Sequence, residues 1–358
     1  MEIQSIHHIT LVCADAQRTA NFYVGLLGMQ MVKQTVNFDR PTTYHLYFGD
    51  ALGAPSTLVT FFEWPDAGRG RPGIGGTHHF ALIVESTNAQ LKWKRYLQDR
   101  GIDVQGPYDR GYFYSIYFRD PDGCRLEIAT RWPGMAADED EDALGREVKL
   151  PHPDQTGKGR DEAAIRAQTW PEPITRVTED MRLTGLHHIS AVCSDIKRTA
   201  AFYTELLGMR VVKKTVNYDD VSIPHWYFGV GEGAPGTLIT YFAYPHGAMR
   251  EARIGQGQTH HFALCVEDEA EQAQWRERLV AAGVQVTPVL DRKYFRSIYF
   301  SDPDGHILEI ATRDPGFQVD EPAPALGQSL ALPPWLEAER ATIEAGLRPL
   351  QIPPAGKP

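Results

Sequence analysis

Four tandem histidine pairs, each followed by an apolar residue, decide the interpretation of this chain. They are Ile6-His7-His8-Ile9, Thr77-His78-His79-Phe80, Leu186-His187-His188-Ile189 and Thr259-His260-His261-Phe262. The third repeats the first after 180 residues, and the fourth repeats the second after 182. Leu126-Glu127-Ile128-Ala129 likewise returns as Leu308-Glu309-Ile310-Ala311. Self-similarity over a fixed period indicates tandem structural units. Both copies carry histidines and a glutamate at matching places. The repeat therefore preserves candidate functional residues as well as structural elements.

Each copy divides again into two units with the same order of elements. Hydrophobic spacing and turn residues indicate a strand, a helix and three further strands in each unit. In the first copy the expected elements are 6–13, 15–27, 31–36, 43–48 and 57–62, then 78–84, 88–100, 102–104, 112–118 and 124–129. We therefore expect an α+β fold built from four βαβββ modules in two tandem repeats.

Two segments, 133–182 and 315–358, lie outside the modules. We expect residues 1–132 and 183–314 to hold two modules each, and residues 133–182 to form a linker and the tail of the first repeat. Residues 315–358 are expected to form a C-terminal tail with a short helix. The acidic run Asp138–Asp142 is typical of a solvated loop, and we assign it no function.

Composition excludes several classes of function. The 358 residues carry a formal net charge of −10 and a pI near 5.7, whereas nucleic-acid binders usually present a basic face. No apolar stretch is long enough for a transmembrane helix, and no signal peptide is evident at the N-terminus. The four cysteines form no disulfide framework. We expect a cytoplasmic protein that binds neither nucleic acid nor membrane.

The histidine pairs and two glutamates are candidate metal ligands. Neighbouring side chains on a strand point to opposite faces, so we expect only one histidine of each pair to face a cavity. Glu127 and Glu309 lie within apolar strands, where a carboxylate is costly unless it is paired or metal-bound. The alternative is that each glutamate pairs with an arginine; the candidates are Arg110, Arg131, Arg292 and Arg313. Two imidazoles and one carboxylate leave open positions on a metal, as in non-heme Fe(II) enzymes.

A third motif places an arginine and a tyrosine near each glutamate. Tyr117 precedes Glu127 by ten residues, as Tyr299 precedes Glu309, and an Asp-Pro-Asp-Gly turn lies between them. Each tyrosine should therefore share a cavity with its glutamate from a neighbouring strand. The alternative, core aromatics with a surface arginine, is accepted for Tyr112 and Phe113. For Arg292 and Tyr299 we favour a role in catalysis, and Arg110 and Tyr117 are their repeat equivalents.

With these motifs the sequence resembles the vicinal oxygen chelate superfamily, and more narrowly its hydroquinone ring-cleaving dioxygenases. The shared motifs include Leu/Ile-His-His-Ile, Thr-Val-Asn-Phe/Tyr-Asp, Tyr-His-Leu-Tyr-Phe-Gly and Asp-Arg-x-Tyr-Phe. The resemblance implies curved mixed sheets around metal-binding cavities. It implies the iron ligands His8, His261 and Glu309, with His7, Arg292 and Tyr299 as catalytic residues around them.

This sequence departs from those relatives in its middle modules, which are usually degenerate. Here they keep a second candidate ligand set and its neighbours: His188, His79 and Glu127, with His187, Arg110 and Tyr117. The resemblance pairs the first module with the fourth and the second with the third. Under the other pairing the ligands regroup as His8, His79, Glu127 and His188, His261, Glu309. The sequence leaves both groupings open.

The main functional hypothesis is Fe(II)-dependent, extradiol-type cleavage of a hydroquinone or catechol by O₂, with Mn(II) as another candidate metal. A homodimer is an expectation from such folds rather than from any residue. The runner-up is a glyoxalase-type isomerase or lyase using Zn or Ni, which usually needs a further acidic ligand. No acid lies within 57–62 or 237–242, and Glu63 falls just beyond the first of these strands. A non-catalytic small-molecule binder is the third hypothesis.

Overall fold

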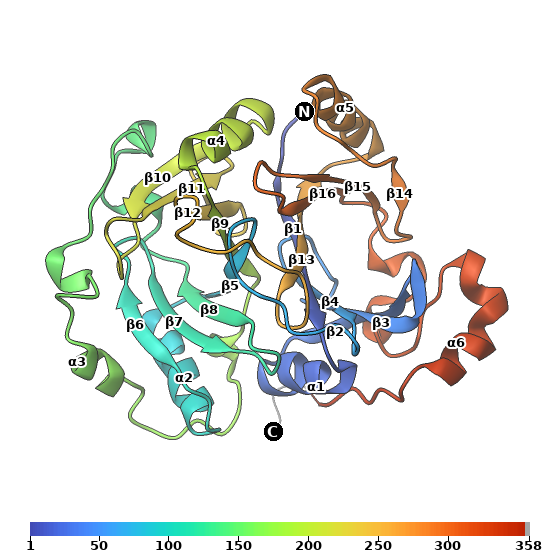
Figure 1. Cartoon of the computed structure of the whole chain (residues 1–358). Helices are drawn as coiled ribbons and strands as arrows, with labels where there is room; N and C mark the ends of the chain where they lie inside the picture. Colours follow the sequence, from blue (N-terminus) through green and yellow to red (C-terminus); the bar gives the residue numbers. More distant parts are fainter. Residues whose placement is uncertain (355–358) are drawn as a thin grey trace.

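Two eight-stranded sheets form the body of the molecule. The computed structural model describes residues 1–354 (Figure 1). The first sheet, in the order β14-β15-β16-β13-β1-β4-β3-β2, contains β1 (Ser5–Cys13), β2 (Gln30–Asn37), β3 (Arg40–Gly49), β4 (Leu58–Glu63), β13 (Thr259–Val266), β14 (Leu290–Asp291), β15 (Arg296–Ser301) and β16 (Ile307–Thr312).

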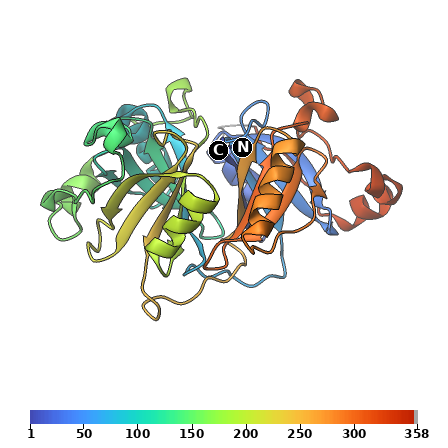
Figure 2. The same cartoon turned by 90° about the horizontal axis from the view of Figure 1, so that it is seen from above.

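The second sheet has the same design. Its order is β10-β11-β12-β9-β5-β8-β7-β6, and it contains β5 (Gly76–Val84), β6 (Gln105–Asp109), β7 (Tyr114–Arg119), β8 (Arg125–Thr130), β9 (Leu186–Cys193), β10 (Arg210–Val216), β11 (Pro224–Gly229) and β12 (Leu238–Ala243). The first module thus pairs with the fourth through β1 and β13, and the second with the third through β5 and β9. Figure 2 shows the resulting two lobes side by side. The expected α+β fold of four modules in curved mixed sheets is confirmed.

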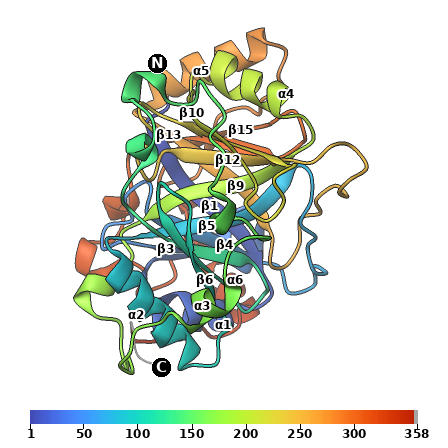
Figure 3. The ribbon, with the colours of Figure 1, turned by 90° about the vertical axis from the view of Figure 1, so that its left-hand side faces the viewer.

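One helix from each module packs against its sheet. They are α1 (Ala16–Ala20), continued by a π-helical turn over Asn21–Leu26, α2 (Thr87–Gln98), α4 (Ile196–Ala201), continued over Phe202–Leu206, and α5 (Glu269–Ala281). An Asp or Ser side chain at each N-cap accepts a hydrogen bond from a backbone N–H of the first turn. Each helix buries an aromatic residue against the sheet: Tyr23, Trp93, Tyr203 and Trp275. Figure 3 shows α2 at one end of the molecule and α4 and α5 at the other.

One expected strand is wrong. Residues 102–104 are not in a strand, and β6 begins only at Gln105. The reason is local: the Ile102 N–H donates to the Leu97 carbonyl at 3.1 Å, past Gly101 with its φ of +76°. Ile102 therefore belongs to the C-terminal cap of α2 rather than to the sheet.

The segments outside the modules pack onto the sheets. They contain α3 (Glu162–Ala167), α6 (Arg340–Gly346) and several 3₁₀ turns, at Met135–Ala137, Glu141–Ala143, Pro153–Gln155, Glu179–Met181, Phe317–Val319, Ala323–Ala325 and Pro334–Glu339. The acidic run is more than a solvated loop, because Asp138 and Glu139 both form ion pairs with the fully buried Lys213. Asp320 and Glu321 hold the buried Lys33 in the same way. None of the helices within residues 1–354 has the length and apolar character that a membrane crossing requires.

Candidate metal centres

Every tandem histidine pair lies at a β-bulge. In the β1–β13 ladder, His7 and His260 are the extra residues, and in the β5–β9 ladder they are His78 and His187. A bulge interrupts the alternation of side chains, so the two neighbouring rings lie side by side. The Nδ1 atoms of each pair are 2.7–2.9 Å apart. The expectation that the two rings diverge to opposite faces is therefore wrong.

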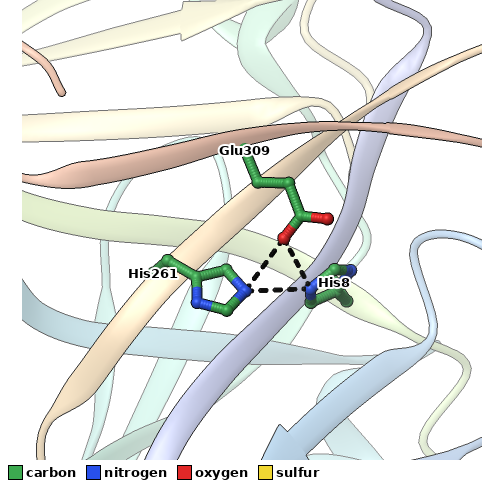
Figure 4. Close-up of side chains that lie close together, drawn as sticks. All are labelled: His8, His261 and Glu309. Carbon is green, nitrogen blue, oxygen red and sulfur yellow. Dashed lines mark hydrogen bonds and ion pairs between the residues drawn. The ribbon is translucent and has the colours of Figure 1, made fainter. Parts of the chain in front are cut away.

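His8, His261 and Glu309 meet between β1, β13 and β16, and we call them the outer centre (Figure 4). The two Nε2 atoms are 3.2 Å apart. Glu309 Oε2 lies 3.0 Å from His261 Nε2 and 3.4 Å from His8 Nε2. All three side chains are buried. Three donor atoms from distant parts of the sequence thus converge on one point.

His79, His188 and Glu127 form an equivalent middle centre between β5, β9 and β8. Their Nε2 atoms are 3.3 Å apart, and Glu127 Oε2 lies 2.9 Å from His79 Nε2 and 3.4 Å from His188 Nε2. The structure therefore groups the six candidate ligands by the first–fourth and second–third pairing. The alternative grouping, with His8 beside His79, is not formed.

Neither glutamate is neutralised by an arginine. Arg131 pairs with Glu85, Arg313 with Glu267, and Arg292 with Asp39. Instead, Ser115 and Ser297 donate a hydrogen bond to the Oε1 atom of Glu127 and Glu309 respectively. The Oε2 atom of each glutamate is buried and faces the Nε2 atoms of the two histidines, and no other group in residues 1–354 donates a hydrogen bond to it. A buried carboxylate oxygen without a donor is costly, and a bound cation would remove that cost.

The protonation states suit metal binding. Burial lowers the pKa of His79 to about 4, so its imidazole is neutral near pH 7. Burial opposes ionisation of Glu127, but the adjacent imidazoles of His188 and His79 hold the pKa of that carboxyl well below its usual range. The neighbouring histidine occupies Nδ1 of each ligand histidine, which leaves Nε2 for the centre. Each centre thus offers two imidazoles and one carboxylate.

The distances also fit one ion in each centre. Two ligand atoms about 2.1 Å from the same metal and at right angles are about 3.0 Å apart. The six observed separations between donor atoms run from 2.9 to 3.4 Å. Each centre could hold a divalent metal by three ligands on one side, with the other positions open.

The predicted tyrosines lie beside the centres. Tyr117 is directly opposite Glu127 in the β7–β8 ladder, and Tyr299 is opposite Glu309 in the β15–β16 ladder. Their rings stand edge-on to ligand histidines, with centroids 5.5 Å from His79 and 5.4 Å from His261. Burial raises the pKa of Tyr117 to about 12, so it is a neutral phenol. Its hydroxyl accepts a hydrogen bond from Arg110 Nη2 at 3.2 Å.

His7 and His187 lie behind the ligands. His7 contacts the far nitrogen of His8, and burial lowers its pKa to about 3, so it is neutral. Phe295 packs against the rings of both His7 and His8. Phe113 does the same for His187 and His188, which places it at the site and not only in the core. These contacts fix the orientation of each ligand ring.

The sequence analysis missed a further pair of residues at each centre. His225 and Tyr227 on β11 line the middle centre, and His45 and Tyr47 are their equivalents on β3. His225 Nε2 is 2.8 Å from Thr240 Oγ1, and its ring stacks on Phe242 at 3.8 Å. The signal was available, because His-x-Tyr-Phe-Gly recurs in both copies with its two polar residues on one strand face.

A cavity of about 70 Å³ adjoins the middle centre. Its wall includes both His78 and His79, because the bulge at His78 turns both rings toward the same side of the strand. A cavity of about 150 Å³ takes up benzene. An aromatic ligand would therefore enter with a movement of the lining side chains, of which Arg110 and Arg125 are the longest.

A family model described as the Glyoxalase/Bleomycin resistance protein/Dioxygenase superfamily matches residues 5–128 and 185–310. The chain belongs to this superfamily. The two matched segments contain fourteen of the sixteen strands in full, most of β8 and β16, and all six candidate ligands. The superfamily assignment thus covers both centres as well as the fold.

Individual relatives extend over nearly the whole chain. It is 32% identical over 352 residues to the "Putative ring-cleaving dioxygenase MhqA" of Bacillus subtilis, covering 98% of this chain and 100% of that protein. It is 29% identical to the "Chlorohydroquinone/hydroquinone 1,2-dioxygenase" of Sphingobium indicum, covering 94% and 93%. The crystal structure of a "putative dioxygenase" from Bacillus subtilis aligns with a TM-score of 0.78 at 30% identity, over 98% of each chain. Glyoxalase I from Zea mays aligns with a TM-score of 0.57 at 17% identity, over 86% of this chain and 92% of that one, which is a likeness of fold.

Proposed function

We propose that this protein is a ring-cleaving dioxygenase that uses Fe(II) and O₂ to open a hydroquinone or a catechol-like ring. The observation that carries the proposal is the pair of centres, each with two imidazoles and a carboxylate oxygen that lacks any other partner. This ligand set leaves room for substrate and O₂ together on one metal. The names of the full-length relatives in two bacteria agree with the same reaction class.

The chain's own residues would bind and orient the substrate. A bound metal would lower the pKa of a coordinated hydroxyl, so that the diol binds in a deprotonated form. Tyr299 then offers a neutral phenol beside His261 for hydrogen bonding and proton transfer to the reacting oxygens. Arg292, with its centre 5.4 Å from the Tyr299 ring, would stabilise negative charge that develops on the opening ring. Tyr117 and Arg110 would do the same in the middle centre.

His7 and His187 have a positioning role in this proposal. Each contacts Nδ1 of a ligand histidine on the side away from the cluster of donor atoms. Such an outer contact fixes the tautomer and the ring orientation of a metal ligand. We therefore assign proton transfer to Tyr299 and not to His7, although the resemblance places both among the catalytic residues.

A glyoxalase-type isomerase, working with Zn or Ni, is the runner-up. It calls for a further acid facing the metal, and Glu63 is the nearest candidate in the sequence. Its carboxylate accepts a hydrogen bond from the Ala16 N–H at 3.0 Å, so it caps α1 instead. The β4 and β12 residues beside the centres are Thr60 and Thr240, which bond to His45 and His225. A non-catalytic binder would need neither complete ligand set.

Oxygen uptake tests the proposal. The protein is loaded anaerobically with Fe(II), its iron is counted, and methylhydroquinone or catechol is added in an oxygen electrode. We expect uptake that depends on the diol and that is lost in the Glu127→Gln/Glu309→Gln double variant. Mn(II) loading is the matched comparison for metal identity. Bound iron without uptake for any diphenol would contradict ring cleavage and favour the isomerase, which consumes no oxygen.

A further inference from the structure

The two centres differ at a few positions of their walls. Among the residues that line the middle cavity, Arg125 has Ile307 as its repeat equivalent, and Tyr218 has Phe38. The ligands, the Arg–Tyr pair and the His-x-Tyr pair are the same in both. The middle centre therefore has one more cationic side chain and one more hydroxyl than the outer centre.

The arginines of the middle cavity have no acidic partner. Neither Arg110 nor Arg125 forms an ion pair with any carboxylate of residues 1–354, although both line the cavity. Arg125 is half-buried, lies 4.6 Å from the Tyr117 ring centroid, and reaches only the amide oxygen of Gln105, at 3.5 Å. The cavity therefore contains two guanidinium groups that form no ion pair, beside the carboxylates of Glu127 and Asp219 that also line it.

The linker explains why Arg110 remains unpaired. Arg160 lies just before α3 and binds Asp219 at 2.7 Å, so this aspartate is already neutralised. In the outer centre the equivalent Asp39 pairs with Arg292 itself, at 3.4 Å. The linker thus leaves Arg110 without a carboxylate partner, whereas its equivalent Arg292 has one.

We propose that the two centres take different substrates, and that Arg125 makes the middle centre select a hydroxylated aromatic ring that carries an additional carboxylate. The outer centre, with Ile307 in that place, takes the uncharged ring. Arg125 is long enough to bind a ring substituent while the diol faces His79, His188 and Glu127, and planar guanidinium groups bind carboxylates by two parallel hydrogen bonds. This assignment rests on the proposed binding of diols at the metal centres.

Anaerobic calorimetry tests the assignment without any turnover. The Fe(II)-loaded chain is titrated with 2,5-dihydroxybenzoate and, separately, with methylhydroquinone. We expect one tight site per chain for the carboxylate, and Arg125→Ile should weaken it about tenfold or more, the value of one charge-assisted hydrogen bond. Arg125→Lys should retain part of the affinity. The reciprocal Ile307→Arg variant should add a second carboxylate site and weaken methylhydroquinone binding at the outer centre, whereas methylhydroquinone affinity should change less than about twofold in the two Arg125 variants.

The outcomes separate this inference from the proposed function. Unchanged carboxylate affinity in Arg125→Ile, with its iron content intact, would overturn the inference even if the protein consumes oxygen. Loss of both ligands together would also overturn it, because it would show a general defect. Selective loss of carboxylate binding in a protein that shows no oxygen uptake would support the inference and count against the dioxygenase.

Discussion

Each candidate ligand histidine contacts a second histidine through its other ring nitrogen. We expect His7→Ala to lower the affinity of the outer centre for iron about 10- to 100-fold, as removal of such contacts does elsewhere. His187→Ala should do the same to the middle centre. Competition with a chelator measures both affinities. Weakening of both centres by either substitution would indicate a general folding defect instead of a local contact.

The tyrosines are predicted to act on substrate and not on the metal. In a Glu127→Gln background, where only the outer centre is complete, Tyr299→Phe should retain its iron and lose about a hundredfold in kcat, the usual contribution of an acid–base group. Tyr117→Phe in a Glu309→Gln background is the matched experiment. Full turnover in Tyr299→Phe would remove the phenol from the mechanism.

At the scale of the residue, the sequence was sufficient to name the candidate ligands but not their surroundings. His8, Glu127 and Glu309 stood out because histidine and carboxylate recurred on apolar strands. The contact between His7 and His8 could not be predicted, since it depends on a bulge that exists only when β1 pairs with β13. The partner strand, 253 residues away along the chain at His261, creates the geometry.

Among the structural elements, the Asp-Pro-Asp-Gly turns are predicted to make stability depend on pH. Burial raises the pKa of Asp120 to about 7 and that of Asp302 to about 6. In the unfolded chain each is near 3.9. The folded state therefore binds more protons, and this contribution to stability is full below about pH 4 and is lost as pH rises through about 7. Denaturant titrations at several pH values should show a flatter dependence in Asp120→Asn; an unchanged slope would contradict the buried, protonated carboxyl.

The tails are predicted to be anchored by the buried lysines. Lys33 lies between Asp320 and Glu321, and removal of one partner from a buried ion pair typically costs about 3 kcal/mol or more. Lys33→Met should lower Tm by several degrees, and Glu321→Gln in the same chain should restore part of the loss. Thermal unfolding of the single and double variants measures this coupling. Additive effects of the two changes would argue against the anchor.

Elements with strong periodicity were predictable, and their ends were not. The strand at 102–104 was misplaced because Ile102 and Val104 have the composition of a strand, while the backbone of Ile102 completes the cap of α2. The ion-pair partner of the acidic run could not be predicted, because Lys213 lies 75 residues from Asp138 along the chain.

For the whole molecule, the crossed pairing of modules means that neither repeat is complete alone. Each centre takes ligands from both repeats: His8 from the first with His261 and Glu309 from the second, and the reverse in the middle centre. We therefore expect residues 1–182 and 183–358 to bind no stoichiometric iron when expressed separately. Coexpression should restore two iron ions per pair of fragments, one for each centre. One tightly bound iron in the first fragment alone would indicate the other grouping, with His8, His79 and Glu127.

The residues alone could not decide between these groupings, because six ligands in two equivalent sets satisfy both. The choice depends on β1 pairing with β13 and β5 with β9, which are contacts between repeats. The number of modules and their internal order were predictable because each module repeats its own hydrophobic pattern. How the modules face one another is a property of the assembled sheets.

The most direct test of the central claim is an isotope measurement on the reaction product. The Fe(II)-loaded protein is mixed with methylhydroquinone under ¹⁸O₂, quenched at once with borohydride to prevent exchange of carbonyl oxygen, and analysed by mass spectrometry. A ring-cleaving dioxygenase should yield an open-chain acid that carries both labelled atoms, and the Glu127→Gln/Glu309→Gln variant should yield none. An unlabelled product, or a ring that remains closed, would contradict the account.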